Sequence, residues 1–291
     1  MRRAIVLTGL MVVGLAHLVS GQGQTSREGR NRISPFSVPA FAPTQPWKGK
    51  VLPDGQPEVA IGIWGAAEPG TRYIDKAPDG VTMASRVVDP PDGMIPYQPW
   101  ALARKKTQDF DLENPTKPWH IDTQGRCLNS IPRLMHYLTP YTVHQGTGFI
   151  AFQFELEHLT RVIRLDGSPH IGSNIKLWMG DSIGRWEGNT LLVDTTNLNA
   201  HGRLSSSGDF VSPNVRLKER MTYLDASNMV YEATIEDPTV FTRPWTMRVT
   251  HRLVSSPLKP ARDLETEIVE YMCYEGEESA GVPSQVPATR P

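Results

Sequence analysis

The sequence has little of what identifies several large functional classes. Its 30 basic and 31 acidic residues give a formal net charge of −1, and such a balance does not favour nucleic-acid binding. It contains no phosphate-binding glycine loop, no dinucleotide fingerprint after an expected strand and no His-Glu-x-x-His zinc signature. We therefore expect no nucleic-acid partner, no nucleotide cofactor and no metal.

Cysteine is almost absent. Cys127 and Cys273 are the two cysteines of the chain. In an oxidising compartment they could form one disulfide, and chain entropy assigns about 4–5 kcal/mol to so long a closure. The alternative is a pair of buried free thiols. No ligand-type spacing flanks either cysteine, which argues against a zinc site.

The N-terminus is the one strongly apolar run. Arg2 and Arg3 precede an apolar stretch over residues 4–19, and small residues follow at Ser20 and Gly21. This order is typical of a secretory signal peptide over residues 1–21, which predicts a periplasmic or secreted protein. A membrane anchor is the alternative, but the run is short for a span, and no later stretch is apolar enough to cross a bilayer.

Proline is abundant, with 25 residues, and it divides the mature chain. Residues 22–125 are rich in proline and glycine, so we expect an irregular extension that wraps the core. One short helix is expected over residues 97–106, because Pro99 suits a first helical turn. Residues 278–291 are expected to form a disordered tail.

Residues 126–277 show a period of two, which is typical of strands with one buried face. Ile150, Phe152 and Phe154 alternate with polar or small residues, and similar alternation recurs over residues 229–235 and 245–253. The short turns between these segments predict antiparallel neighbours. We expect a mainly β protein with a lipocalin-like antiparallel barrel, because many strands in a row must hide their edges. A two-layer β-sandwich is the alternative.

Three motifs resemble a family of uncharacterised exported proteins of proteobacteria and acidobacteria. They are Asp89-Pro-Pro-Asp-Gly-Met-Ile-Pro96, Gly180-Asp-Ser-Ile-Gly-Arg-Trp-Glu-Gly-Asn-Thr-Leu-Leu-Val-Asp-Thr195 and Cys273-Tyr-Glu-Gly276. The chain departs from the family pattern at Met94, Tyr274 and Glu277, where the family has Arg, His and Asn. The resemblance implies export, but it implies no established activity.

Two groups of residues could carry catalysis. His158 and Glu157 are adjacent, His170 follows, and Asp181 stands beside a serine in the central motif. A histidine next to a carboxylate is the usual arrangement for proton transfer. Glu155 and Glu157 would share one face of a strand, looking into either a cavity or solvent. For Asp181 the alternative is a structured turn in which Arg185 pairs with a carboxylate and Trp186 packs at the barrel end.

A third group indicates a pocket for a ligand. Trp245, His251 and Tyr231 fall on apolar strand faces, and we expect Trp186 and Arg185 to lie near the same site. A single titratable group among aromatic side chains is typical of a site for a small hydrophobic molecule. The sequence thus supports three hypotheses: a small-molecule binding protein, a cofactor-independent hydrolase, lyase or isomerase, and a structural protein of the cell envelope. It leaves the oligomeric state open.

Overall fold

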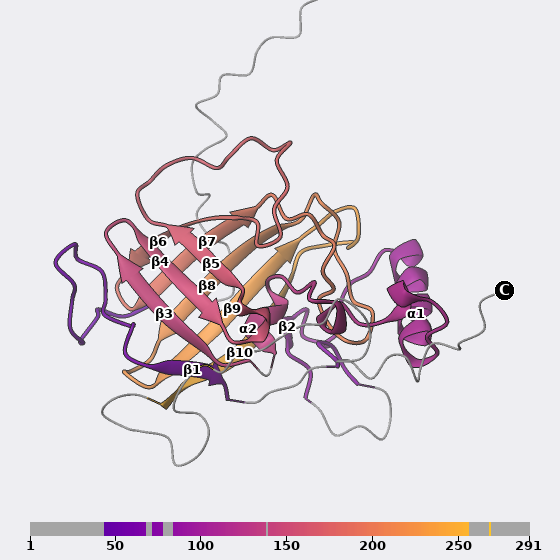
Figure 1. Cartoon of the computed structure of the whole chain (residues 1–291), viewed down its shortest axis with the longest axis horizontal. Coiled ribbons are helices and arrows are strands. Elements are labelled where there is room, and N and C mark those ends of the chain that lie inside the picture. Colours follow the sequence, from indigo (N-terminus) through magenta and orange to yellow (C-terminus); the bar gives the residue numbers. More distant parts are fainter. Residues whose placement is uncertain (1–43, 68–71, 78–83, 138, 256–267, 269–291) are drawn as a thin grey trace, which may run out of the picture. The chain divides into compact units, whose positions relative to one another are not determined.

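The computed structural model describes residues 44–67, 72–77, 84–137, 139–255 and 268 (Figure 1). The expected signal peptide, the expected tail and Cys273 lie outside these residues. The strands are β1 (Ile63–Ala66), β2 (Val87–Asp89), β3 (Tyr141–Gly146), β4 (Phe149–Phe154), β5 (Thr160–Arg164), β6 (Asp181–Glu187), β7 (Thr190–Thr196), β8 (Arg216–Tyr223), β9 (Asn228–Glu236) and β10 (Trp245–Ser255).

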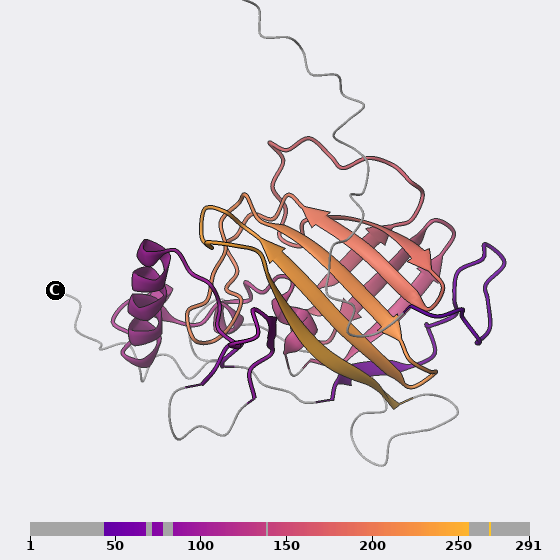
Figure 2. The same ribbon diagram turned by 180° about the vertical axis from the view of Figure 1, so that it is seen from behind.

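Nine of these strands close into a barrel. The sheet runs β1-β3-β4-β5-β6-β7-β8-β9-β10, and β1 also pairs with β10, while β2 adds to β10 from outside the ring. Figure 2 shows β8, β9 and β10 from behind, side by side as this order requires. The expectation of a mainly β barrel is confirmed, and closure of the ring excludes the two-layer sandwich.

One neighbouring pair is parallel, which corrects the expectation of a wholly antiparallel sheet. Strand β5 pairs with β6 in parallel, through Ile163 with Ser182 and Arg164 with Ile183. A ring with an odd number of strands cannot alternate direction all the way round, so at least one pair must be parallel. The long connection over residues 165–180 turns the chain so that β6 runs in the same direction as β5 and begins beside its last residues, with Ser182 next to Ile163.

The proline-rich extension supplies part of the barrel as well as a helix. Strand β1 comes from the extension and pairs with both β3 and β10. The expected helix is confirmed as α1 (Pro99–Glu113), which begins at Pro99 and runs further than the sequence predicted. A second helix, α2 (Arg133–His136), and three short 3-10 helices, η2 (Pro118–His120), η3 (Gln124–Arg126) and η4 (Leu156–His158), follow.

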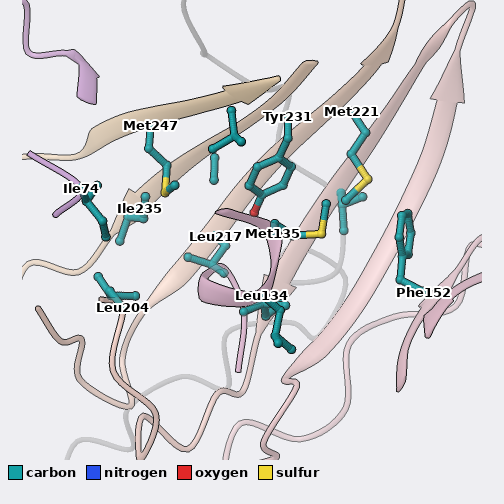
Figure 3. Packing of buried hydrophobic residues seen from close by; sticks show 14 of the residues in the cluster. Ile74, Leu134, Met135, Phe152, Leu204, Leu217, Met221, Tyr231, Ile235 and Met247 are labelled. Atoms are coloured by element: carbon teal, nitrogen blue, oxygen red, sulfur yellow. The ribbon is translucent and has the colours of Figure 1, made fainter. Parts of the chain in front are cut away.

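Apolar side chains fill the barrel interior. Phe152, Tyr231 and Met247 belong to one buried cluster, as the alternation in the sequence predicted (Figure 3). Leu134 and Met135 of α2 join the same cluster and lie among the strand side chains in Figure 3. Helix α2 therefore fills the interior from the end of the barrel where β8 begins.

An ion pair is buried in this interior. Arg161 of β5 donates to both carboxylate oxygens of Glu219 of β8, with Nη1 at 2.9 Å from Oε1 and Nη2 at 2.5 Å from Oε2, and both side chains are 0% exposed. The guanidinium also donates to Ser182 and Thr195, and the Tyr231 hydroxyl donates to Glu219 at 2.7 Å. Because Ser182 lies on β6 and Thr195 on β7, Arg161 ties β5 to the strands beyond the parallel junction.

The Arg161 side chain should therefore be essential for stability. We expect Arg161→Met to lower the free energy of unfolding by about 3–5 kcal/mol, because Glu219 is left as a buried charge without its partner. Chemical denaturation measures the change. As a matched control, Arg185→Met removes an exposed pair with Glu187 and should cost less than about 1 kcal/mol. Equal losses in the two variants would contradict this role for Arg161.

Candidate functional site

A pocket of about 570 Å³ opens at the end of the barrel where β8 ends. Its walls come from residues 45–61 of the extension, from β1, from the turn between β8 and β9, and from the end of β10. Helix α2 fills the barrel from the opposite end of the same strands. The closed end is thus packed by α2, and the other end carries the pocket.

Aromatic side chains form much of the pocket wall. Tyr223 packs edge-on against Trp64 and Trp47, with ring centroids 5.6 Å and 6.4 Å away, and lies 5.8 Å from Trp186. Val59, Ile61, Leu224 and Leu253 add apolar surface to the lining. Burial raises the pKa of the Tyr223 hydroxyl, so the group stays neutral at ordinary pH. The wall is therefore apolar with a neutral phenol.

Residues 44–50, which we call the strap, are held in place by the motif over residues 180–195. Asn189 accepts from the backbone N–H of Gln45 at 2.7 Å and donates its own N–H to the Gln45 carbonyl at 2.8 Å. Gly188 has φ 56°, and a Cβ there would stand 2.1 Å from the Gln45 oxygen. The Gly-Asn pair of the motif is therefore needed both for the turn between β6 and β7 and for the passage of the strap.

The Trp47 side chain is fixed by two other residues of the strap, Lys50 and Gly49. Its indole Nε1 donates to the Lys50 carbonyl at 2.7 Å, and Gly49 lies so close to the ring that a Cβ would stand 2.5 Å from it. Lys48, Lys50, Glu58 and Asp225 supply charged groups to the lining. The arrangement suits a molecule with an apolar body and a polar end.

The structure places the residues that were predicted to bind a ligand in three different regions: the barrel interior, the side of the end pocket and the outer surface. Trp245, His251 and Tyr231 are buried in the barrel interior and do not line the end pocket. Trp186 packs against Tyr223 beside that pocket, as its expected place at the barrel end required. Arg185 points outward and pairs with Glu187 at 2.7 Å, which agrees with the alternative that Arg185 pairs with a carboxylate.

His251 is a neutral core residue. Its Nδ1 lies 3.0 Å from the Tyr141 hydroxyl, and its ring packs against both Tyr141 and Tyr231. Burial lowers its pKa to about 4, nearby Arg86 acts in the same direction, and the Met135 backbone acts against them. His251 is buried in the packing between α2 and the strands.

His170 and Asp181 meet on the outer wall of the barrel. His170 comes from the crossover of residues 165–180, and its Nδ1 lies 2.6 Å from Asp181 of β6. Its Nε2 lies 3.5 Å from Asp194 of β7. Arg164 of β5 donates to both Asp181 oxygens at 2.8 Å and 3.0 Å, and Arg216 of β8 pairs with Asp194. The histidine therefore sits between two carboxylates that each hold an arginine.

This network shifts the pKa of each of its ionisable members toward the charged form. Burial lowers the pKa of His170, but Asp194 and Asp181 outweigh it, and the net pKa is raised. Burial raises the pKa values of Asp181 and Asp194, but hydrogen bonds from His170 and the arginines outweigh it, and both are lowered. The cluster is an ion network that attaches the crossover to the barrel. Its Arg164 bridges β5 and β6 on the outer face of the barrel, as Arg161 does in the interior.

Glu157 and His158 lie in a different region from His170 and Asp181. They lie in η4, between β4 and β5, whereas Arg164 and its partner Asp181 are at the far end of β5, about 13 Å along the strand. Glu157 accepts from the Asn129 backbone at 3.2 Å and from its amide at 2.7 Å. Burial raises its pKa to about 7, against the effect of these hydrogen bonds.

The expectation that Glu155 and Glu157 share a strand face is wrong. Strand β4 ends at Phe154, Glu155 takes right-handed helical angles, and Glu157 has φ 59°. The chain must turn here to enter β5, which breaks the alternation that the sequence shows. The proposed unit of His158, His170, Asp181 and Glu157 is thus separated into two sites.

The residues of the end pocket were the ones that sequence reasoning missed. Trp47, Trp64 and Tyr223 lie in three segments that are far apart in the chain, and two of them come from the extension. The available signals were the apolar piece around Trp64 and the alternation that places Tyr223 on the inner face. Neither signal indicates which end of the barrel stays open.

Comparison with known proteins gives no match to a family model, to a curated protein or to a solved structure. Among the described residues, no three His, Cys, Asp or Glu side chains are grouped as metal ligands. None of the helices in this part of the chain has the length and apolar character of a membrane-spanning helix. The resemblance of the three motifs to a family therefore stays a prediction.

The His170 network should make stability depend on pH. The stabilisation from His170 is complete below its unfolded pKa of about 6.5 and is lost as pH rises through its raised folded pKa. The contributions of Asp181 and Asp194 are lost as pH falls through their lowered folded pKa values. His170→Gln should thus lower the melting temperature most near pH 5, by up to about 3 °C, and least near pH 9.

Thermal denaturation across this pH range measures the difference. His144→Gln is the matched control, because His144 is exposed and contacts Thr142 on β3. The control should show no such trend with pH. A His170→Gln deficit that grows as pH rises would contradict the assigned charges.

Proposed function

We propose that the protein binds a small apolar or aromatic molecule in the pocket at the end of the barrel. One observation carries the proposal: a pocket of about 570 Å³ is walled by Trp47, Trp64 and Tyr223 at an open barrel end. Ligand sites are concave, largely apolar and about 300–1,000 Å³ in volume, with a few polar groups. The pocket meets each of these conditions.

The contacts of the three aromatic side chains support the proposal further. Trp64 and Tyr223 are almost wholly buried and pack on each other, so their positions are set before a ligand arrives. Trp47 is fixed by its hydrogen bond to Lys50. Preformed aromatic walls lose little conformational freedom on binding, and aromatic contacts contribute about 0.5–1.5 kcal/mol beyond area burial.

The enzyme hypothesis has weaker support. His170 and Asp181 form the close pair that acid–base catalysis needs, but each partner is held by further charges, and neither residue lines the end pocket. Glu157, whose pKa is raised toward neutrality, lies at the other end of β5. The pair is better suited to fastening the crossover than to proton transfer.

Export is the second part of the proposal. The signal-like segment over residues 1–21 supports delivery to the periplasm or the exterior, and a ligand-binding barrel agrees with such a location. Cys127 lies at the end of η3 with φ 54°, and its predicted partner Cys273 lies outside the described residues. We propose that the two cysteines form a disulfide in the exported protein.

Mass spectrometry tests the disulfide. The exported protein is alkylated with iodoacetamide under denaturing conditions, with and without prior reduction. We expect two added carbamidomethyl groups only after reduction, because the bridge protects both thiols. Two groups added without reduction would contradict the bridge and would leave the ligand site unaffected.

Ligand binding is tested with N-phenyl-1-naphthylamine, an apolar aromatic probe whose fluorescence rises in an apolar site. We expect saturable binding, and we expect Trp47→Ala to weaken it about tenfold, or about 1.4 kcal/mol, because one wall is removed. Fluorescence titration measures the dissociation constant.

The control variant is Trp119→Ala, which removes an exposed tryptophan that does not line the pocket. It should leave the affinity within about twofold of the parent. Circular dichroism and thermal melting confirm that both variants fold. Absence of saturable binding, or equal affinity in all three proteins, would contradict the proposed site.

A further inference from the structure

A second cavity, of about 460 Å³, lies against α1, which stands beside the barrel in Figures 1 and 2. One wall is a single face of α1, formed by Leu102, Lys105, Lys106 and Asp109 at helical spacing. The other walls are residues 73–76 and residues 90–97. The Asp-Pro-Pro-Asp-Gly-Met-Ile-Pro motif thus lines a cavity, a role that the barrel itself does not explain.

Asp75 is the unusual residue of this cavity. Its residue exposure is 8%, and its carboxylate forms no ion pair and no side-chain hydrogen bond with the described part of the chain. Burial raises its pKa to about 6, nearby Asp209 adds to this, and Lys105 and backbone N–H groups act against it. A buried carboxylate without a side-chain donor is only partly compensated for its lost hydration, and such groups are often found at ligand or active sites.

The nearby carboxylate of Asp209, in contrast, accepts hydrogen bonds from three hydroxyl groups. It accepts from the Tyr97 hydroxyl at 2.8 Å and from the Ser207 hydroxyl at 2.9 Å, and Ser205 donates to it as well. Its donors are in place without any ligand. Of these two neighbouring carboxylates, Asp75 receives backbone N–H groups but no side-chain donor from the described residues, and it is the one that lines the cavity.

The basic residues of the cavity form no ion pair with the described residues. They are Lys76, Lys105 and Lys106. Asp109 on the same wall is instead paired with Arg72 at 3.2 Å. The cavity therefore presents one buried acceptor on its floor and several flexible cations around it.

The remaining lining is apolar or aromatic. Tyr73 and Tyr97 contribute rings, and Met94, Ile95 and Leu102 contribute aliphatic surface, with Met94 and Leu102 among the exposed large hydrophobic side chains. Such a surface suits the body of a small organic molecule. The two kinds of charge then suit opposite ends of that molecule.

We infer that this cavity binds a small zwitterion of amino-acid type, with its ammonium group on Asp75, its carboxylate on the lysines and an apolar side chain against Met94 and Leu102. The ammonium supplies the charged donor that the described side chains around Asp75 do not supply. The site is separate from the barrel-end pocket and shares no lining residue with it. Either site can therefore fail without the other.

Three probes with the same phenyl body test the inference: L-phenylalanine, 3-phenylpropanoate, which lacks the ammonium, and phenethylamine, which lacks the carboxylate. NMR titration of the full mature chain measures each affinity. We expect L-phenylalanine to bind at least about tenfold more tightly than either analogue, because each analogue leaves one charged group of the site without a partner.

The Asp75→Asn variant should weaken L-phenylalanine binding at least about tenfold and leave 3-phenylpropanoate binding unchanged, because only the first ligand uses the carboxylate. Asp166→Asn, the same change at an exposed turn outside the cavity, is the matched control and should leave both affinities unchanged. Thermal melting supplies a second readout: Asp75→Asn should melt at the same temperature as the parent or higher, because an unpaired buried charge is removed.

The inference is overturned if L-phenylalanine does not bind at millimolar concentration, or if it binds the parent and Asp75→Asn equally. Equal affinity for all three probes would also overturn it, because a purely apolar site would then be sufficient. A marked fall in the melting temperature of Asp75→Asn would show that the carboxylate has a structural partner.

Discussion

The parallel junction between β5 and β6 is the constraint on which the rest of the structure depends. These two strands pair through only two register positions, and yet the ring must stay closed there. Arg161 crosses the junction inside the barrel to Ser182, Thr195 and Glu219, and Arg164 crosses it outside to Asp181. Charged hydrogen bonds with several partners are stronger than neutral ones, so they reinforce a junction where the ladder itself is short.

This junction also explains why the most conspicuous polar residues are not grouped as an active site. A parallel connection needs a long crossover, and residues 165–180 must then be fastened to the outer wall. His170 provides that attachment through Asp181 and Asp194, and Asn189 of the motif over residues 180–195 holds the strap. The interior is filled by side chains and by α2, and the two cavities that we propose as binding sites lie at the barrel end and at the flank beside α1.

Much of the fold could be predicted from the pattern of residues. The alternation over residues 149–154, 228–236 and 245–255 places Phe152, Tyr231 and Met247 on one buried face, because strand side chains alternate whatever the topology. Helix α1 was predictable from Pro99 and its neighbours. The pairing of β1 with β3 and β10 was not, since a four-residue strand in a proline-rich segment carries almost no periodic signal. For the candidate site, the sequence predicted an apolar and aromatic pocket but not the residues that line it.

The sequence by itself determined the local properties of this protein: the strand faces, the turns at Gly188 and Asp225, the start of α1 and the apolar interior. These follow from side-chain periodicity and backbone preference, which act over a few residues. The tertiary structure decided which residues from distant segments meet. It joined Trp47, Trp64 and Tyr223 at one end of the barrel, separated Glu157 from His170, and placed Asp75 in the cavity beside α1 without a donor from the described side chains. Ring closure sets these distances, and it depends on all nine strands at once.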